Sequence, residues 1–574
     1  MGVARIVLIG VTGLLMACGP TAPDAGQGNQ SAGGSGADRG RTLVLVSRAE
    51  PDTIADKEVF SVTGLSFSAT PRLFNAGLAI LDGQESPQPY LVEAHPQLNT
   101  DTWRVFPDGR METVYRLRPN LRWHDGNALS AQDFAFAWRI YSNPEFGQAG
   151  SPPISQIEDV VAVDDRTIAI RWRGSFPNAD AIESADFQAL PRHILEELYQ
   201  PDQVESFGRQ LFWTRDYVGL GPYRLDNWQP GSFLEASAFD AHAWGRPKID
   251  RVRVLFISDF NTVLATMLAG EAHITVDDAI RYQQGAILRR EWGPRNAGTI
   301  LTTPDQWRRS EIQQRPEYAN PRGILDARVR RALAYSIDKL ALNEGLFEGE
   351  AILADTFVPP TTSFFPDLER AITKYPYDVR RSEQLMTEAG YVKGPDGIYT
   401  HPADGRFSGE LKVNDSAQAE AEMAILAAGW RQAGFEFREI PVPQSQSRLG
   451  EVRGSFPTLY NGGGGVTGSI NEGSSGSFIS ARIANPDNRW VGGNRSGWSN
   501  PEYDRLFASY TSTLDRPQRV QQMIRMVQIF TEDAAAIPLY FNPGIVAHIA
   551  ALKGPHPFGP EADVSWNVHE WEWR

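Results

Sequence analysis

The chain has a single cysteine, no excess of positive charge and none of the common catalytic or metal-binding motifs. One cysteine, Cys18, excludes an internal disulfide. A net charge of −15 argues against a nucleic-acid partner, which would need a basic surface. There is no HExxH, no pair of cysteines, no Walker A loop and no GxSxG elbow, and no two of the nine histidines are four residues apart. We therefore expect no catalytic residue, no metal site and no cofactor.

One glycine-rich segment, Gly463 to Gly468, does fit the GxGxxG pattern of dinucleotide-binding proteins. In those proteins the motif ends a strand and opens a helix. Here the residues that follow, SINEGSSGSF, are a poor opening for a helix. We therefore interpret this segment as a loop and not as a nucleotide site.

The first 40 residues have the pattern of an export signal followed by a tether. Arg5 precedes an apolar run from Ile6 to Met16, which is too short to span a membrane. Leu15-Met16-Ala17-Cys18 then resembles a bacterial lipobox, which implies cleavage before Cys18 and attachment of lipid to its sulfur. The residues up to Gly40 are rich in Gly, Ala, Ser, Asp and Gln and predict a flexible tether. We thus expect a signal peptide over 1–17, a tether over 18–40, and a body held at a membrane outside the cytoplasm.

Length and composition indicate a soluble protein of several domains. A chain of 574 residues exceeds one hydrophobic core, and 41% apolar with 22% charged residues is ordinary for a globular protein. The stretch from Val114 to Trp138 predicts a strand, a turn at Gly126 and a helix. Ser130 is the expected N-cap of that helix, and Asp133 completes a capping box.

Further helices follow from spacing and capping residues. Leu325 to Leu342 predicts one amphipathic helix, in which Arg330 and Arg331 lie on a solvated face. Ala419 to Ala433 predicts another, ended by Gly434. Strands alternate with these helices, which is typical of an α/β fold. The stretch from Arg281 to Pro321 is long and polar.

Several short motifs, taken in order, resemble those of the family 5 extracellular solute-binding proteins, the peptide-, nickel- and opine-type receptors of ABC importers. The signature is Leu-Arg-Pro, Trp-His-Asp-Gly and Leu-Ser-Ala, followed by an aspartate and a helix, as found between Leu117 and Trp138. Each motif alone is weak, but their order along the chain from about Arg41 to about Phe541 is specific. The other matches are Gly219 to Tyr223, Asp326 to Asp338, Tyr377 to Tyr391 and Asn500 to Asp504.

The resemblance implies an α/β fold of the large periplasmic-binding-protein type (type II, cluster C). Such a protein has two α/β lobes joined by a hinge and an extra domain on the first lobe. It would capture an oligopeptide or other small solute between the lobes and deliver it to ABC permease subunits in the membrane, working as a monomer. The expected boundaries are 41–77, 215–276 and 538–574 for lobe I, 78–214 for the extra domain, and 277–537 for lobe II.

The expected ligand site lacks one feature of the peptide-binding members. There, the segment equivalent to 460–463 carries an aspartate that meets the peptide's charged N-terminus, whereas here it is Tyr-Asn-Gly-Gly. The acidic anchor is therefore missing or displaced, and Glu472 is the nearest carboxylate. Two alternatives stay open: a secreted, lipid-anchored hydrolase, and a peptide-binding chaperone or signalling receptor on the same fold. The residues expected in the cleft are Asn75, Trp307, Asn461, Gly463, Asn494 and Trp498.

Overall fold

The structure is a computed structural model that describes residues 41–59, 67–466 and 473–574. The expected signal peptide and tether, with Cys18, lie outside the described residues, and so does Glu472. Within the three described ranges, no helix is both long enough and apolar enough to cross a bilayer. The description that follows concerns the unit from Gly40 to Arg574.

A large mixed sheet runs through this unit in the strand order β18-β17-β19-β12-β20-β11-β1-β10-β9-β8, with β13 paired to β20. Parallel strands occur on both sides of the centre of the sheet. On one side β1 pairs in parallel with β10 and with β11, and on the other side β17 pairs in parallel with β18 and with β19. The strands are β1 Thr42–Ser47, β8 Tyr223–Gln229, β9 Phe233–Ala238, β10 Arg251–Phe256, β11 Ile274–Thr275, β12 Gly298–Ile312, β13 Ile352–Leu353, β17 Ser408–Asn414, β18 Glu436–Val442, β19 Leu459–Gly465 and β20 Ala536–Ile549.

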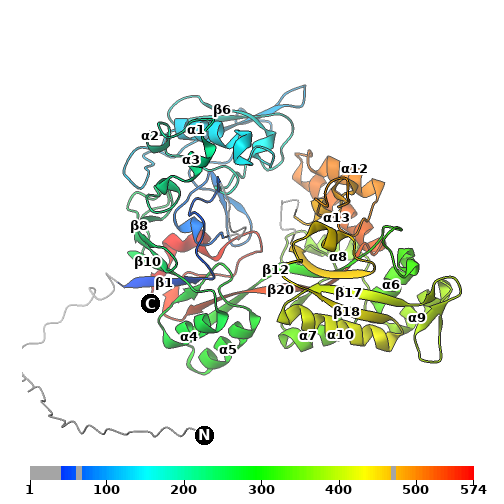
Figure 1. Cartoon of the computed structure of the whole chain (residues 1–574). Helices are drawn as coiled ribbons and strands as arrows, with labels where there is room; N and C mark the ends of the chain where they lie inside the picture. The colour runs from blue at the N-terminus through cyan, green and yellow to red at the C-terminus, as the bar shows by residue number, and fades with distance from the viewer. Residues whose placement is uncertain (1–40, 60–66, 467–472) are drawn as a thin grey trace, which may run out of the picture. The chain divides into compact units, whose positions relative to one another are not determined.

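Two long antiparallel strands, β12 and β20, join the two halves of the sheet. They pair from Gly298 opposite Ile549 to Glu311 opposite Ala536, with register shifts near the middle. The C-terminal end of β20 pairs with β11, and the C-terminal half of β12 pairs with β19. Figure 1 shows β12 and β20 passing between the part that carries β1 and β10 and the part that carries β17 and β18. This is the arrangement expected of a hinge between two lobes.

A smaller sheet, in the order β4-β5-β7-β6, forms a separate part with α1 packed on β6 and β7. The predicted strand–turn–helix is confirmed, because β5 is followed by a turn at Gly126, with φ +89°, and by α1. Asp133 accepts a hydrogen bond from the backbone N–H of Ser130 at 2.8 Å, as expected for a capping box. The elements are β4 Trp103–Val105, β5 Met111–Arg116, α1 Ala131–Tyr141, β6 Ile157–Ala162, β7 Thr167–Trp172, α2 Arg192–Leu195 and α3 Val204–Gly208.

Helices elsewhere begin and end where capping residues predict. Asn500 caps α12 by accepting from the N–H groups of Glu502 and Tyr503, and Gly434 ends α10 with φ +111°. Such caps satisfy backbone groups that a helix leaves unpaired at its ends. The helices are α4 Phe260–Ala269, α5 Tyr282–Trp292, α8 Phe365–Ala371, α9 Val379–Glu388, α10 Ala417–Ala433, α11 Gly450–Gly454, α12 Pro501–Tyr510 and α13 Arg516–Glu532. The remaining short strands are β2 Ala79–Leu81, β3 Pro87–Pro89, β14 Val392–Lys393, β15 Tyr399–His401, β16 Gly405–Arg406, β21 Leu552–Lys553 and β22 Glu572–Trp573.

One expectation about local structure is wrong. The single helix expected over Leu325 to Leu342 is two helices, α6 Ala327–Tyr335 and α7 Lys339–Phe347. Asp338 starts the second one by accepting from the N–H of Ala341 at 2.9 Å. The long polar stretch from Arg281 to Pro321 contains both α5 and β12.

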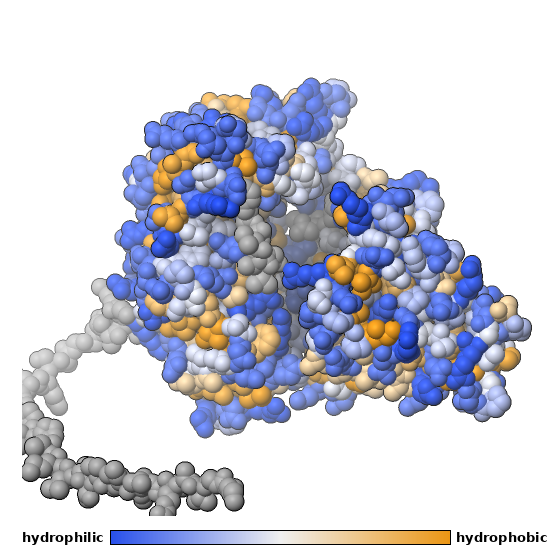
Figure 2. Space-filling model, in the orientation of Figure 1, coloured by the Kyte–Doolittle hydropathy of each residue, from blue (hydrophilic) through white to orange (hydrophobic). Residues whose placement is uncertain are grey.

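The apolar side chains are gathered in separate cores. One underlies β1, β10 and the smaller sheet, a second surrounds α6 and α10, and a third lies between β12, α8, α12 and α13. On the face seen in Figure 2, hydrophilic residues predominate and apolar ones form small separate patches. The polar side chains that could bind a ligand must therefore be sought where these cores meet.

Candidate ligand-binding site

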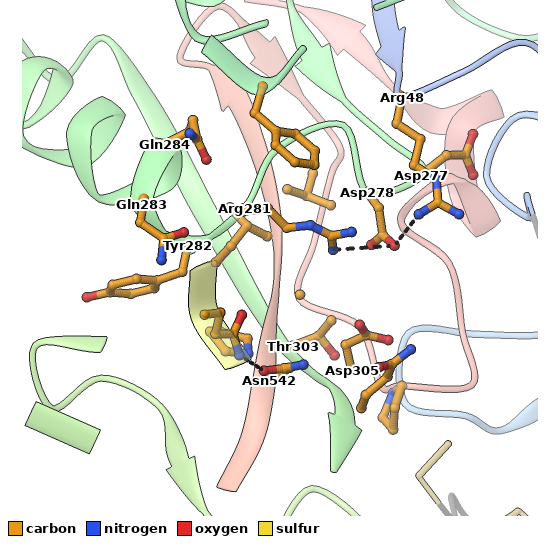
Figure 3. Close-up of a pocket in the computed structure, with 18 of the residues that line it drawn as sticks. Arg48, Asp277, Asp278, Arg281, Tyr282, Gln283, Gln284, Thr303, Asp305 and Asn542 are labelled. Atoms are coloured by element: carbon orange, nitrogen blue, oxygen red, sulfur yellow. Dashed lines mark hydrogen bonds and ion pairs between the residues drawn. The ribbon is translucent and has the colours of Figure 1, made fainter. Parts of the chain in front are cut away.

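A cavity of about 900 Å³ lies beside β12 and β20. Its walls come from Arg48, from residues 277–284 at the start of α5, from residues 416–419 at the start of α10, and from residues 558–564. Residues expected in both lobes thus line it, as a site that closes around a solute requires. Its volume is in the range of small-molecule sites. Figure 3 shows the charged and amide side chains that surround it.

Most charged groups in the cavity are held by partners within the protein. Asp278 pairs with Arg48 at 3.5 Å and with Arg281 at 3.6 Å, and Figure 3 marks both contacts. Asp277 accepts hydrogen bonds from the backbone N–H groups of Ser68 at 3.1 Å and Ala69 at 3.0 Å. Burial nevertheless raises the pKa of Asp277 to about 6.

The opposite wall is fixed by a buried network around Glu422 of α10. Arg308 donates to both Glu422 oxygens, at 3.0 and 2.9 Å, and Tyr540 donates a hydroxyl hydrogen bond to the same carboxylate. Burial alone would lower the pKa of Arg308, but Glu422 raises it above its usual value. Gln418 donates to Asn542 Oδ1 at 2.7 Å and presents a neutral polar surface next to this network.

Asp305, on β12, is the exception. It lines the cavity beside Thr303 (Figure 3), and among the described residues none forms a hydrogen bond or ion pair with its carboxylate. Burial and, to a lesser degree, Asp278 raise its pKa to about 6. At neutral pH the carboxylate is therefore mainly ionised and free to accept hydrogen bonds from a solute.

The residues expected in the cleft from the sequence do not line this cavity. Asn75 is buried, and its amide donates to the carbonyl oxygens of Ile54 and Pro71 at 2.6 and 2.7 Å. Asn494 is fully buried and donates to the carbonyl of Trp498 at 2.7 Å. Asn461 donates to Glu422 at 3.0 Å, directly behind the cavity wall. A role for these residues in ligand binding stays a prediction.

The other three expected residues contact neighbouring parts of the protein and do not line the cavity. Trp307 is fully buried and its indole N–H donates to Ser474 Oγ at 2.8 Å. Trp498 packs on Tyr503 with ring centroids 5.0 Å apart. Gly463 lies against the cavity residue Gln306, because a Cβ at 463 would be 2.6 Å from Gln306 Oε1.

Sequence reasoning missed Asp305 and Arg308, although both flank Trp307, which it singled out. Strict alternation would place Asp305 on the face of Trp307 and Arg308 on the other face. The pairing of β12 with β20 shifts register between Pro304 and Trp307 and again between Arg308 and Arg309, and both side chains line the cavity. Alternation alone therefore could not have identified the pair.

The sequence matches the family model for the bacterial extracellular solute-binding proteins, family 5 (middle region), over residues 93–484. The chain belongs to this family. One relative is the glutathione-binding protein GsiB of Escherichia coli O1:K1 / APEC. It is 25% identical over 526 residues, which cover 87% of this chain and 92% of the relative. The family consists of binding proteins of transporters, and these matches give no support to a hydrolase.

Solved structures show the same fold. NikZ from Campylobacter jejuni, in complex with Ni(L-His), matches with a TM-score of 0.70 and 20% identity over 92% of this chain and 99% of that chain. The oligopeptide binding protein from Thermus thermophilus, complexed with a pentapeptide, matches with a TM-score of 0.67 and 21% identity over 93% and 96%. The expected fold class is thus confirmed, and the chain is a substrate-binding protein. The boundaries expected for the lobes and the extra domain stay predictions.

Proposed function

We propose that the chain is the lipid-anchored substrate-binding subunit of an ABC importer, which captures an oligopeptide or a similar small solute in the cavity beside β12 and β20. Family membership supports the binding role, and the walls drawn from both expected lobes support the location. The relative named above is a glutathione-binding protein, and solved neighbours hold a pentapeptide or Ni(L-His). Delivery to a membrane permease, anchoring through Cys18 and a monomeric state are parts of this proposal.

Asp305 is the observation that carries the binding mode. The segment that would supply an acidic anchor is Tyr460-Asn461-Gly462-Gly463, without a carboxylate. Asp305 provides an unpaired one on the neighbouring strand, facing the cavity. A solute ammonium group there would gain a charge-assisted hydrogen bond and relieve the burial of an isolated charge. Aromatic side chains in the cavity walls, among them Phe260 and Phe347, would cover apolar parts of the solute.

Hinge closure explains how binding is signalled. A solute that touches both halves of the sheet binds the closed form more tightly than the open form, so it shifts the population toward closure. The long strands β12 and β20 are the covalent connections on which this motion would turn, and the closed form would be what the permease recognises.

The test uses the full chain and its Asp305→Asn variant, with Asp202→Asn as a control at an exposed position. Native mass spectrometry identifies the solute that remains bound after purification, and calorimetry then measures its affinity. We expect Asp305→Asn to weaken binding of an amine-bearing solute at least about tenfold, since an ion pair in a buried site is lost. Equal affinity for all three proteins would remove Asp305 from the site.

A further inference from the structure

A second group of charges lies away from the cavity, on the face of β12 opposite Arg308. It consists of Arg309 on β12, Arg453 on α11, Arg495 before α12, and Glu311. Arg309 and Glu311 are each 4% exposed, and Arg309 Nη2 lies 2.5 Å from Glu311 Oε1. Arg309 packs on the ring of Trp307, 4.5 Å from its centroid. The guanidinium of Arg309 is thus held in place on one side.

The charges of this basic cluster do not balance. Three guanidinium groups face one carboxylate, and within the described ranges neither Arg453 nor Arg495 forms an ion pair. The Nε and Nη1 atoms of Arg309 and the Nε atom of Arg453 are buried without an acceptor among the residues that the structure describes. Burial lowers the pKa of both Arg309 and Arg453, and Arg495 adds to the effect in each case. Unmatched buried cations are costly, which an anion in the cluster would offset.

The glycines of β19 leave room for such an anion. Gly464 and Gly462 pair with Trp307 and Arg309 across the ladder, and residues two apart share a face. A Cβ at Gly464 would lie 2.4 Å from Arg309 Nη1, so only glycine allows the guanidinium to approach the strand. At Gly462 no atom of the described residues lies within 4 Å of where a Cβ would be, which leaves space next to Arg309 on this face.

We propose that Arg309, Arg453 and Arg495 bind an anion that carries a carboxylate or a phosphate, in the space over Gly462 and Gly464, on the face of β12 away from the cavity. Guanidinium groups match the planar geometry of these oxyanions and bind them through two parallel hydrogen bonds. This anion site is separate from the cavity, so the inference goes beyond the proposed function and does not depend on which solute the cavity holds.

The test measures thermal stability of the full chain in succinate, in inorganic phosphate and in neutral succinamide, with ionic strength held constant by sodium chloride. The double variant Arg453→Gln/Arg495→Gln removes the two half-buried cations, and Arg448→Gln is the matched control at an exposed position next to α11. We expect succinate or phosphate to raise the melting temperature of the wild type and of Arg448→Gln, with the shift lost in the double variant. Succinamide should give no shift.

The outcomes separate the possible ligands and the two proposals. A shift with succinate assigns the cluster to carboxylates, and a shift with phosphate alone assigns it to phosphate-bearing solutes. Equal shifts in wild type and double variant, or none in either, overturn the inference. The proposed function is tested separately, through the dependence of the bound solute on Asp305, so it stands or falls independently of this anion site.

Discussion

The absence of a side chain at Gly464 allows the guanidinium of Arg309 to lie against β19. Gly464→Ala would put a Cβ 2.4 Å from Arg309 Nη1 and 2.9 Å from Trp307 Nε1, so the guanidinium must move. We expect affinity for succinate or phosphate to fall about tenfold, as for loss of a charge-assisted contact. Gly465→Ala is the matched control, because no atom of the described residues lies within 4 Å of its Cβ position. Calorimetry on both variants checks this, and equal affinities would contradict it.

Asp305 makes both stability and binding depend on pH. Its pKa is raised to about 6 in the folded chain, above its value in the unfolded chain, so the folded state binds this proton more tightly. The stability that this proton provides is full below about pH 4 and is lost as the pH rises through about 6. Asp305→Asn should therefore raise the free energy of unfolding of the solute-free protein by about 1–3 kcal/mol at pH 7.5 and change it little at pH 4.

Denaturant unfolding of Asp305→Asn at the two pH values measures this difference, with Asp202→Asn as the control. Binding should follow the opposite trend, because an ammonium group needs the ionised carboxylate. Affinity for an amine-bearing solute is thus expected to decrease below pH 6 in the wild type. A stability change that is the same at both pH values would contradict the assignment of this titration to Asp305.

The motifs in the sequence were sufficient to recognise the family, but they did not predict which residues line the cavity. Asn75 and Asn494 were both expected in the cleft, and the structure shows both engaged with backbone carbonyls. Asp305 and Arg308 line the cavity, and Arg309 lies in the basic cluster. Their partners are distant in sequence, such as Glu422 for Arg308, so no local pattern predicts them.

At the scale of elements, the capping box of α1 serves more than one helix end. Asp133 accepts from the N–H of Ser130 at 2.8 Å and also from the N–H of Arg192, at the start of α2, at 3.0 Å. Ser130→Ala should cost about 0.5–2 kcal/mol of stability, as for loss of a cap. Asp133→Ala should cost more, because it leaves backbone donors on two helices without an acceptor. Chemical denaturation ranks the two variants, and the reverse order would contradict this account.

Capping residues made most helix ends predictable from the sequence. Contacts between residues that are far apart in the sequence were not predictable. Arg330 and Arg331 were expected on a solvated helix face. Instead Arg330 is buried and donates to the carbonyl of Asp533 at 3.1 Å, and Arg331 donates to that of Glu532 at 2.7 Å. The two arginines thus satisfy carbonyls at the C-terminal end of α13, about 200 residues away. The break between α6 and α7 was missed because Ile337 and Leu340 continue the apolar periodicity across Asp338, which caps a new helix.

At the scale of the molecule, a contact bridges residues expected in the extra domain and in lobe II. Arg519 of α13 donates to Asn178 Oδ1 at 3.1 Å, and Leu514 packs on the core beneath the smaller sheet. Because these residues lie outside the cavity, the contact would favour a closed form without touching the solute. Arg519→Ala should weaken solute affinity severalfold, mainly through faster dissociation. Stopped-flow dissociation measures this, and an unchanged rate would contradict a role in closure.

Anchoring is a separate property of the whole chain. If Cys18 carries lipid, the protein is found with membranes, and Cys18→Ser releases it into the soluble extracytoplasmic fraction. Solute affinity of the released protein should equal that of the wild type, since the body from Gly40 to Arg574 is a separate unit. Fractionation of expressing cells tests this. A wild-type protein already in the soluble fraction would contradict the anchor.

The central claim is that this chain captures a small charged solute in the cavity beside β12 and β20. Native mass spectrometry of the full chain, compared with its denatured mass, tests it most directly. The account predicts one or more discrete added masses that belong to solutes with an amine, and that disappear in Asp305→Asn. An added mass that persists in this variant, or a protein that carries none and is not stabilised by any amino-acid-derived solute, would contradict it.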